Sequence, residues 1–285
     1  MLLTDADSTP RTARGRTRAT VRVTGMRIES GSAARVRESL AEEMPVTLAY
    51  NLVPYAVMMA TPADLEDFAV GFSVTEGVVA SGDAVQHVTV VPYRKGIELQ
   101  IDVAADIAVA VGSRSRRLSG RTGCGICGTD NVARVLRELP VVRRDVTIES
   151  SAVTRAMREL ATRQPLNDET GAVHAAGWAR RDGSLAYVRE DVGRHNALDK
   201  LVGALFRARE PADKGFVVMT SRGSFELVQK AAILGVSLLA TVSAPTALAV
   251  RVAEQAGVSL VGFARDERLT VYTHEARVRM RAGDA

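Results

Sequence analysis

Residues 216–273 alternate between short apolar runs and segments of helical periodicity, and this alternation limits the possible folds more than any other feature. The expected strands are Phe216–Thr220, Val236–Val242 and Val258–Phe263, with helices over Ser224–Leu234 and Pro245–Ala256. Strands joined by helices of this length form a parallel sheet covered by helices. The sequence therefore predicts an α/β carboxyl-terminal half.

The rest of the chain is predicted to be α+β, with a smaller β-rich amino-terminal part. Strands are expected over Val21–Met26, Met44–Tyr50 and Tyr55–Ala60, and a hairpin over residues 85–103. One helix is expected after Thr61-Pro62. Further helices over residues 151–163, with a Ser cap, and 196–207 flank strands over residues 174–179 and 185–188. We thus predict a disordered basic arm (residues 1–20), a β-rich subdomain with one helix (21–111), a flexible loop (112–130) and an α/β cofactor-binding domain (131–285).

The formal net charge of +4 originates in the first 40 residues, which hold eight arginines and four acids. The remainder is balanced, with 37 − 8 = 29 bases and 33 − 4 = 29 acids. This distribution indicates a solvated arm and argues against nucleic acid as the main partner. No apolar run is long enough to span a bilayer, and the amino terminus lacks the apolar core of a signal peptide. We expect a cytoplasmic protein that does not act at a membrane.

Both cysteines lie in the run Gly123-Cys124-Gly125-Ile126-Cys127-Gly128. Two thiols at this spacing can form a reversible disulfide, supply half of a zinc site, carry a sulfane sulfur as a persulfide, or form a buried structural pair. A zinc site needs about four ligands, so His or a second subunit would have to complete it. A thioredoxin-like motif belongs near the start of a βαβ unit, which is not its position here. Nearby positive charge favours the reactive thiolate, and four arginines precede the motif: Arg114, Arg116, Arg117 and Arg121.

Polar turns follow the predicted parallel strands. Ser221-Arg222-Gly223-Ser224 and Ser243-Ala244-Pro245-Thr246 each end a strand and open a helix. If the strands are neighbours, both turns lie at the carboxyl edge of the sheet, where ligands bind in open α/β folds. Helix amino termini, hydroxyls and Arg222 would suit phosphates, although Ser and Thr are also ordinary helix caps. The next loop, Phe263-Ala264-Arg265-Asp266-Glu267-Arg268, could hold a nucleotide or be a solvated turn.

A further polar run is Glu190-Asp191-Val192-Gly193-Arg194-His195-Asn196, which holds more polar groups than helix capping requires. His195 could be a base, a donor to phosphate or a capping residue, and its position in the sequence leaves these roles open. His174 follows apolar residues and is interpreted as a core histidine.

Four segments together resemble the formate dehydrogenase accessory proteins, the FdhD family. They are Arg121–Gly128, Glu190–Lys200, Thr220–Lys230 and Phe263–Arg265, within a resemblance that runs from about Val46 to Thr273. The resemblance implies a sulfur carrier, or sulfurtransferase, that takes sulfane sulfur from a cysteine desulfurase. It delivers this sulfur to the molybdenum (or tungsten) bis-guanine-dinucleotide cofactor, which is a bound substrate, before the cofactor enters formate dehydrogenase.

The resemblance also implies a homodimer whose carboxyl-terminal half is a three-layer αβα domain like that of cytidine deaminases. It maps the persulfide cysteine onto Cys124, with Cys127 as its companion, and cofactor binding onto Phe263–Arg268. Deaminase zinc chemistry is not expected, because Ala175-Ala176 follow His174 where deaminases carry a carboxylate, and no permanently bound metal is predicted. We expect the cofactor to be held also by Ser221, Arg222, Ser243, Thr246 and His195. The rival hypotheses are a non-catalytic cofactor chaperone and a zinc-binding scaffold.

Overall fold

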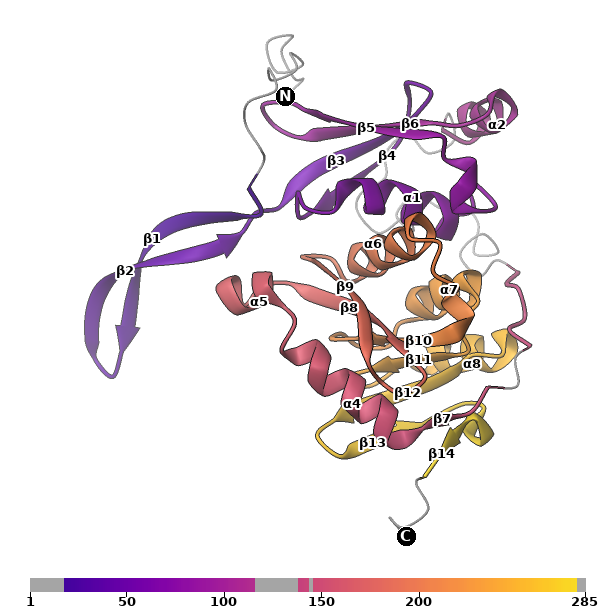
Figure 1. Cartoon of the computed structure of the whole chain (residues 1–285). Coiled ribbons are helices and arrows are strands. Elements are labelled where there is room, and N and C mark those ends of the chain that lie inside the picture. The colour runs from indigo at the N-terminus through magenta and orange to yellow at the C-terminus, as the bar shows by residue number, and fades with distance from the viewer. Residues whose placement is uncertain (1–17, 116–137, 144–145, 281–285) are drawn as a thin grey trace.

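The computed structural model describes residues 18–115, 138–143 and 146–280 (Figure 1). Three bodies are visible in it: a projecting hairpin, an amino-terminal sheet with its helices, and a larger carboxyl-terminal α/β body. The predicted residues Cys124 and Cys127, and most of the predicted arm and loop, lie outside the described residues.

The amino-terminal sheet has the order β4 (Val53–Ala60), β3 (Met44–Tyr50), β6 (Ile97–Asp102) and β5 (His87–Pro92). Helix α1 (Leu65–Thr75) packs on one face, where alternate strand residues such as Leu48 and Leu99 meet Phe68. This alternation is what the period of two in a half-buried strand requires. The predicted strands, hairpin and helix are confirmed here.

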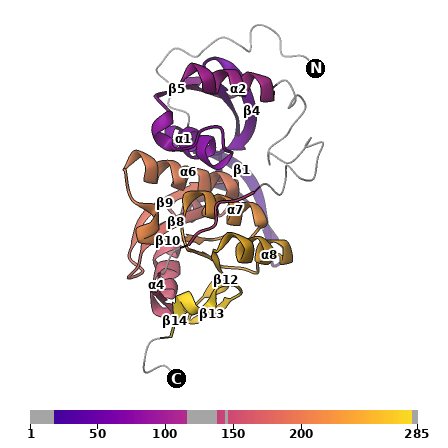
Figure 2. The same cartoon turned by 90° about the vertical axis from the view of Figure 1, so that its right-hand side faces the viewer.

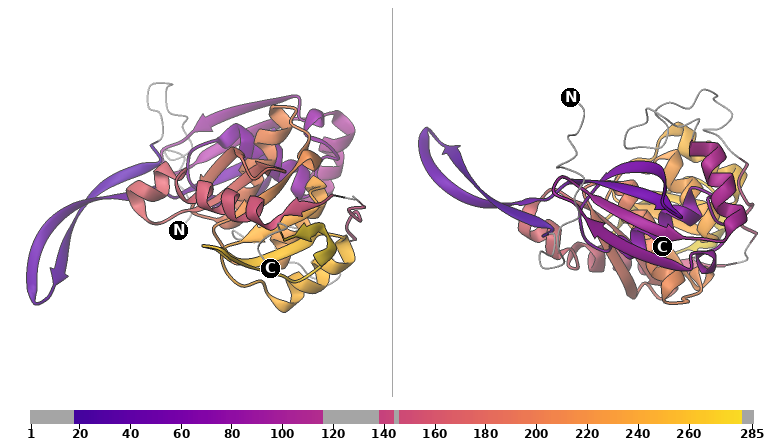
Figure 3. Two further views of the ribbon diagram at one scale, coloured as in Figure 1. Left: turned by 60° about the horizontal axis from the view of Figure 1, so that its bottom comes forward. Right: turned by 90° about the horizontal axis from the view of Figure 1, so that it is seen from above.

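Two features of this part differ from the sequence prediction. A second helix, α2 (Ala105–Ser115), follows β6, so residues 112–115 are helical and do not belong to a loop. The first strand is longer than expected: β1 (Thr20–Glu29) pairs with β2 (Ser32–Ala41) in an antiparallel hairpin that projects from the body (Figure 3).

The carboxyl-terminal sheet has six strands. Its order is β13 (Arg268–Val271), β12 (Ser259–Arg265), β11 (Leu238–Thr241), β10 (Gly215–Met219), β8 (His174–Arg180) and β9 (Leu185–Asp191). Strands β10, β11 and β12 are parallel neighbours, as predicted, whereas β8, β9 and β13 pair antiparallel. The remaining helices and strands are α4 (Ser150–Ala161), α5 (Pro165–Thr170), α6 (Arg194–Arg207), α7 (Phe225–Leu234), α8 (Ala247–Ala256), β7 (Ile148–Glu149) and β14 (Val278–Arg279).

Helices cover both faces of this sheet, which gives three layers (Figure 2). In β10, Val217 and Met219 belong to the core beneath α6, α7 and α8, whereas Phe216 and Val218 belong to the core beneath α4. A strand buried on both faces reads as a continuous apolar run, which is the pattern of this segment. The mixed α/β class is confirmed, and the likeness to cytidine deaminases remains a prediction. Residue Glu149 precedes the first residue of α4 as its N-cap, in place of the expected Ser cap.

The two main bodies meet where α1 lies across α6. A Cβ atom on Gly71 of α1 would overlap the backbone carbonyl of Asp199, and one on Gly203 of α6 would overlap that of Asp67. Glycine at both positions therefore allows the two backbones to approach closely. This contact places the amino-terminal body against the middle of α6.

Candidate functional site

The polar segments singled out in the sequence meet at one edge of the six-stranded sheet. Strands β10, β11 and β12 are parallel, so their carboxyl ends share an edge. Strand β8 is antiparallel to β10 and therefore starts at this edge, and β9 is antiparallel to β8 and therefore ends there. The turn before α6, the turn before α7, the turn before α8 and the end of β12 therefore follow one another along the sheet. We call this region the carboxyl-edge site.

The two Ser-containing turns are locked together by backbone hydrogen bonds. The N–H of Gly223 donates to the carbonyl of Ala244 at 3.2 Å, and the N–H of Thr246 donates to the carbonyl of Gly223 at 2.9 Å. The Thr246 hydroxyl accepts from the N–H of Ala249 at 3.2 Å and so caps α8. Ser221 is buried, whereas the side chain of Arg222 is exposed. The expected neighbourhood of these turns is confirmed.

The end of β12 lies against the second of these turns. The Phe263 N–H donates to the Ser243 carbonyl at 3.3 Å, and Phe263 adopts a positive φ of 51° beside a bulge in the β12–β13 pairing. Positive φ is uncommon for a bulky residue and marks a position that its surroundings constrain. The guanidinium of Arg268 lies 5.8 Å from the centre of the Phe263 ring, within range of a cation–π contact.

Not every residue of the predicted loop faces this site. Ala264 is fully buried in the core beneath α4, so its side chain is unavailable to a ligand. Glu267 lies 3.6 Å from Arg158 of α4, on the opposite face of the sheet. Arg265 and Asp266 are exposed near the β12–β13 turn. Within this loop, the better candidates for contacting a ligand that carries both negative charge and an aromatic base are therefore Phe263, Arg265 and Arg268.

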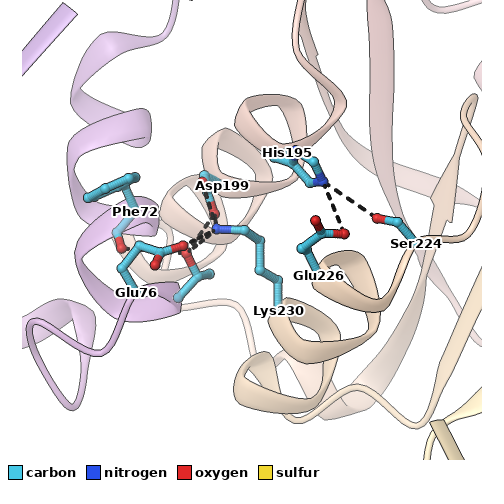
Figure 4. A network of polar contacts seen from close by, with 8 residues as sticks. Phe72, Glu76, His195, Asp199, Ser224, Glu226 and Lys230 are labelled. Carbon is cyan, nitrogen blue, oxygen red and sulfur yellow. Dashed lines mark hydrogen bonds and ion pairs between the residues drawn. The ribbon is translucent and has the colours of Figure 1, made fainter. Parts of the chain in front are cut away.

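His195 contacts the first polar turn and helix α7 (Figure 4). Its Nε2 lies 3.5 Å from the Ser224 hydroxyl and 3.7 Å from a carboxylate oxygen of Glu226. Burial opposes ionisation of Glu226, but its interactions with His195, with its own backbone N–H and with Ser224 outweigh burial and lower the pKa to about 2. The ionised Glu226 therefore holds the His195 ring at the site.

His174 lies at the same edge, opposite Asp191 in the β8–β9 pairing. It is only partly buried, so its interpretation as a core histidine is wrong. Burial and the nearby Arg194 guanidinium lower its pKa, which favours the neutral ring. The Nε of Arg194 is itself buried and, within the described residues, has no hydrogen-bond partner.

The polar run before α6 has a second use, which is to join the two bodies. The Asp191 carboxylate pairs with Lys200 at 2.6 Å, and both side chains are fully buried. It also accepts from the N–H groups of Thr61 at 3.0 Å and of Gly193 at 2.8 Å, while Asn196 donates to the Met59 carbonyl at 2.8 Å. This bonding explains why the run holds more polar groups than a helix cap needs.

A buried ionic cluster lies one helical turn beyond His195 and Glu226, along the same two helices. Lys230 of α7 donates to Asp199 of α6 at 2.8 Å and to Glu76 at 2.9 Å (Figure 4). Burial raises the pKa of Asp199 despite the neighbouring ammonium group, and the two carboxylates raise that of Lys230 despite its burial. The sequence analysis missed Glu226 and Lys230 as site residues; their spacing of four on one helix was the available signal.

The chemistry of the carboxyl-edge site suits an anionic group. Helices α6, α7 and α8 all begin at this edge, and the unpaired N–H groups of a helix amino terminus attract phosphate. Exposed Arg222 and Arg265 add positive charge, and Phe263 and His195 add rings. Across the part of the chain that the structure describes, no group of three His, Cys, Asp or Glu side chains is placed to hold a metal ion, and no helix is long and apolar enough to cross a membrane.

These features define a mixed α/β protein with an anion-type site at the carboxyl edge of its larger sheet. Residues 41–279 match the FdhD/NarQ family, and the chain belongs to that family. The sulfur carrier protein FdhD of Xanthomonas axonopodis pv. citri is 51% identical over 252 residues, which cover 88% of this chain and 90% of that protein. The sulfur carrier protein FdhD of Bordetella petrii is 47% identical over 258 residues, covering 90% and 93%.

A solved structure shares the fold. The crystal structure of a formate dehydrogenase accessory protein from Desulfotalea psychrophila matches with a TM-score of 0.72 at 24% identity, covering 92% of this chain and all of that one. The family resemblance stated from the sequence is thus confirmed. The names of the relatives support a sulfur-carrier role in general terms.

Proposed function

We propose that this protein is a sulfurtransferase that accepts sulfane sulfur from a cysteine desulfurase as a persulfide on Cys124. It passes the sulfur to a molybdenum bis-guanine-dinucleotide cofactor, its second substrate, which formate dehydrogenase needs for activity. Cys127 is the companion of Cys124 in this loop. The protein acts as a homodimer in the reducing cytoplasm, where free thiols persist.

The observation that carries this proposal is the convergence of three helix amino termini and the predicted polar turns on one sheet edge. A guanine dinucleotide brings phosphates, which suit helix N–H groups and arginine, and purine rings, which suit stacking on Phe263. A chain that serves only as a thiol donor needs no such edge. The site therefore supplies a destination for the sulfur within the same protein.

The first sulfur transfer, from the donor to Cys124, needs no further oxidant or reductant. The Cys124 thiolate attacks the outer sulfur of the donor's persulfide, the donor's sulfur–sulfur bond breaks, and the donor cysteine leaves as a thiolate. Cys124 then carries the sulfur as a persulfide. The residues of the carboxyl-edge site bind and orient the cofactor that receives it, with His195 held there by Ser224 and Glu226.

The test is sulfur labelling. The purified protein is incubated with a cysteine desulfurase and ³⁵S-cysteine, and protein-bound label that a reductant releases is counted. We expect label on the wild type and on Cys127→Ala, and none on Cys124→Ala, with unchanged circular dichroism in all three proteins. An unlabelled wild type would support the chaperone hypothesis, and a labelled Cys124→Ala would exclude that residue as the carrier.

A further inference from the structure

The hairpin formed by β1 and β2, here called the β1–β2 arm, exposes side chains that a folded protein ordinarily covers. It extends away from both bodies (Figures 1 and 3), and Met26 and Ile28 are 68% and 72% exposed. An isolated two-stranded hairpin is marginally stable in water. The exposed apolar side chains therefore make the arm suited to binding a partner.

The pairing register sorts the arm into two unlike faces. Val21 pairs with Leu40 and Gly25 with Val36, so one face is largely apolar, and Arg27 and Glu38 pair with each other on it at 2.7 Å. The opposite face carries three exposed arginines and no acid, Arg22, Arg35 and Arg37, and it also carries the exposed Met26 and Ile28. Among the described residues none of these three guanidinium groups forms an ion pair.

The arm is basic, whereas the chain that follows it is balanced. Residues 20–41 hold four arginines and two acids, a net charge of 4 − 2 = +2, and residues 42–285 hold equal numbers of bases and acids. Pairing with the same arm of a second copy would bring like charges together, so arm-to-arm association leaves the charge unmatched. A nucleic acid would match the arginines but leave the apolar face in water. An acidic protein surface with apolar patches satisfies both faces.

The position of the arm indicates what such a partner would reach. Strand β2 contacts α5, and the backbone N–H groups of Leu166 and Asn167 in α5 donate to Glu190 at 3.0 Å and 2.8 Å. Glu190 directly precedes Asp191 at the carboxyl-edge site. A protein held on the arm therefore lies beside that site, where the cofactor is proposed to bind. The family match begins at residue 41, where β2 ends, so the arm stands outside the part that defines the family.

We propose that the β1–β2 arm docks an acidic surface of the protein that receives the cofactor from the carboxyl-edge site. This inference rests on the proposed function, because it identifies the partner as the recipient in that relay. The arginines supply charge complementarity and orientation, and Met26 and Ile28 beside them, together with the valine-rich face, supply apolar contact. The arm takes no part in the sulfur chemistry.

The test compares two triple charge reversals in the full-length protein. The arm variant is Arg22→Glu, Arg35→Glu and Arg37→Glu. The control variant is Arg180→Glu, Arg181→Glu and Arg251→Glu, which reverses the same amount of charge at exposed sites on the carboxyl-terminal body. Binding to purified cofactor-free formate dehydrogenase is measured by biolayer interferometry at two salt concentrations. We expect the arm variant to lose about tenfold to a hundredfold in affinity, the control to stay within about threefold, and wild-type binding to weaken with salt.

Other outcomes overturn the inference. They are equal binding by the arm variant and the wild type, an absence of wild-type binding, or a loss that appears instead in sedimentation of the dimer or in binding to a duplex DNA probe. The ³⁵S labelling of Cys124 is measured on the same variants and should be unchanged. A failure of labelling would contradict the proposed function, whereas intact labelling with unaffected docking would contradict only the role of the arm.

Discussion

Glu226 and His195 form a side-chain contact between two different helices, α7 and α6. Glu226 lies in the first turn of α7, where the positive end of the helix dipole stabilises a carboxylate. His195 lies in the first turn of α6. Their contact at 3.7 Å brings both helix starts to the same point of the carboxyl-edge site. The ionised carboxylate is thus part of what holds the site together.

Replacing Glu226 by Gln should remove a pH-dependent part of the stability. The folded-state pKa of Glu226 is about 2 against an ordinary value of 4.5, so the ionised form stabilises the fold above pH 4.5, and this contribution is lost as the pH falls towards 2. We expect the variant to be less stable by about 2 kcal/mol at neutral pH, with the difference from wild type shrinking in acid. Urea unfolding followed through Trp178, the single tryptophan, measures it.

The matched control is Glu254→Gln, because Glu254 also lies near a histidine, His274 at 4.0 Å, but has a 64% exposed side chain. An exposed pair contributes little, so this variant should change the free energy of unfolding by at most a few tenths of a kcal/mol. A Glu226→Gln deficit that stays constant from neutral pH to acid would contradict the assignment.

Single residues show how far sequence reasoning extends. His195 was recognised as polar and ambiguous because its whole neighbourhood in sequence is polar. Glu226 was passed over, because an acid in the first turn of a helix needs no further explanation. Its partner lies 31 residues earlier in the chain, and only the tertiary fold brings the two together. The side-chain placement of Ala264 was equally out of reach, since it depends on a bulge in β12.

At the scale of elements, the crossing of α1 and α6 depends on glycine. Changing Gly203 to Ala should force the helices apart, because the new methyl group would overlap the Asp67 carbonyl. Overpacking of this kind costs about 1–3 kcal/mol. The control is Gly112→Ala in α2, where a Cβ meets nothing within 4 Å and alanine is the better helix former. Urea unfolding should show a lower stability for the first variant and an unchanged or higher one for the second; the reverse order would contradict the packing argument.

Elements with a strong periodic signal were predictable, and those without one were missed. The alternation of β10, α7, β11, α8 and β12 emerged from the sequence because buried parallel strands are continuous apolar runs between amphipathic helices. Helix α2 was missed because Gly112 and the Ser/Arg-rich residues around it have the composition of a loop. The six-residue helix α5 is too short for periodicity to reveal. Its anchoring by Glu190 is a tertiary contact.

At the scale of the whole molecule, an ion pair and buried hydrogen bonds connect the two bodies. Lys230 reaches Glu76 across 154 positions of sequence, and Asp191 reaches the backbone of Thr61 across 130. These contacts link α7 and the turn before α6 to the end of α1 and to the loop that precedes α1. No pattern in the sequence predicts them, because a buried lysine and a surface lysine look alike in a helix. The carboxyl-edge site is therefore built on an interface that only the complete chain forms.

The Asp191–Lys200 pair gives the sharpest test of this interface. Changing Lys200 to Met removes the ammonium partner at 2.6 Å and leaves a fully buried carboxylate and the Thr61 carbonyl without that donor. Removing one member of a buried pair costs about 3–5 kcal/mol. Because three donors to Asp191 remain, we expect a loss of about 3 kcal/mol. Lys214→Met, at an exposed lysine, should leave stability unchanged.

A second substitution distinguishes the stability lost with the charge partner from the stability lost with packing. Adding Asp191→Asn to Lys200→Met removes the uncompensated charge while keeping a side chain of the same shape, so the double variant should regain about 1 kcal/mol or more over Lys200→Met alone. Urea unfolding curves of wild type, both single variants and the double variant complete the cycle. If the two single losses simply add in the double variant, the pair does not act as a unit, and the interface must owe its stability to the α1–α6 contact instead.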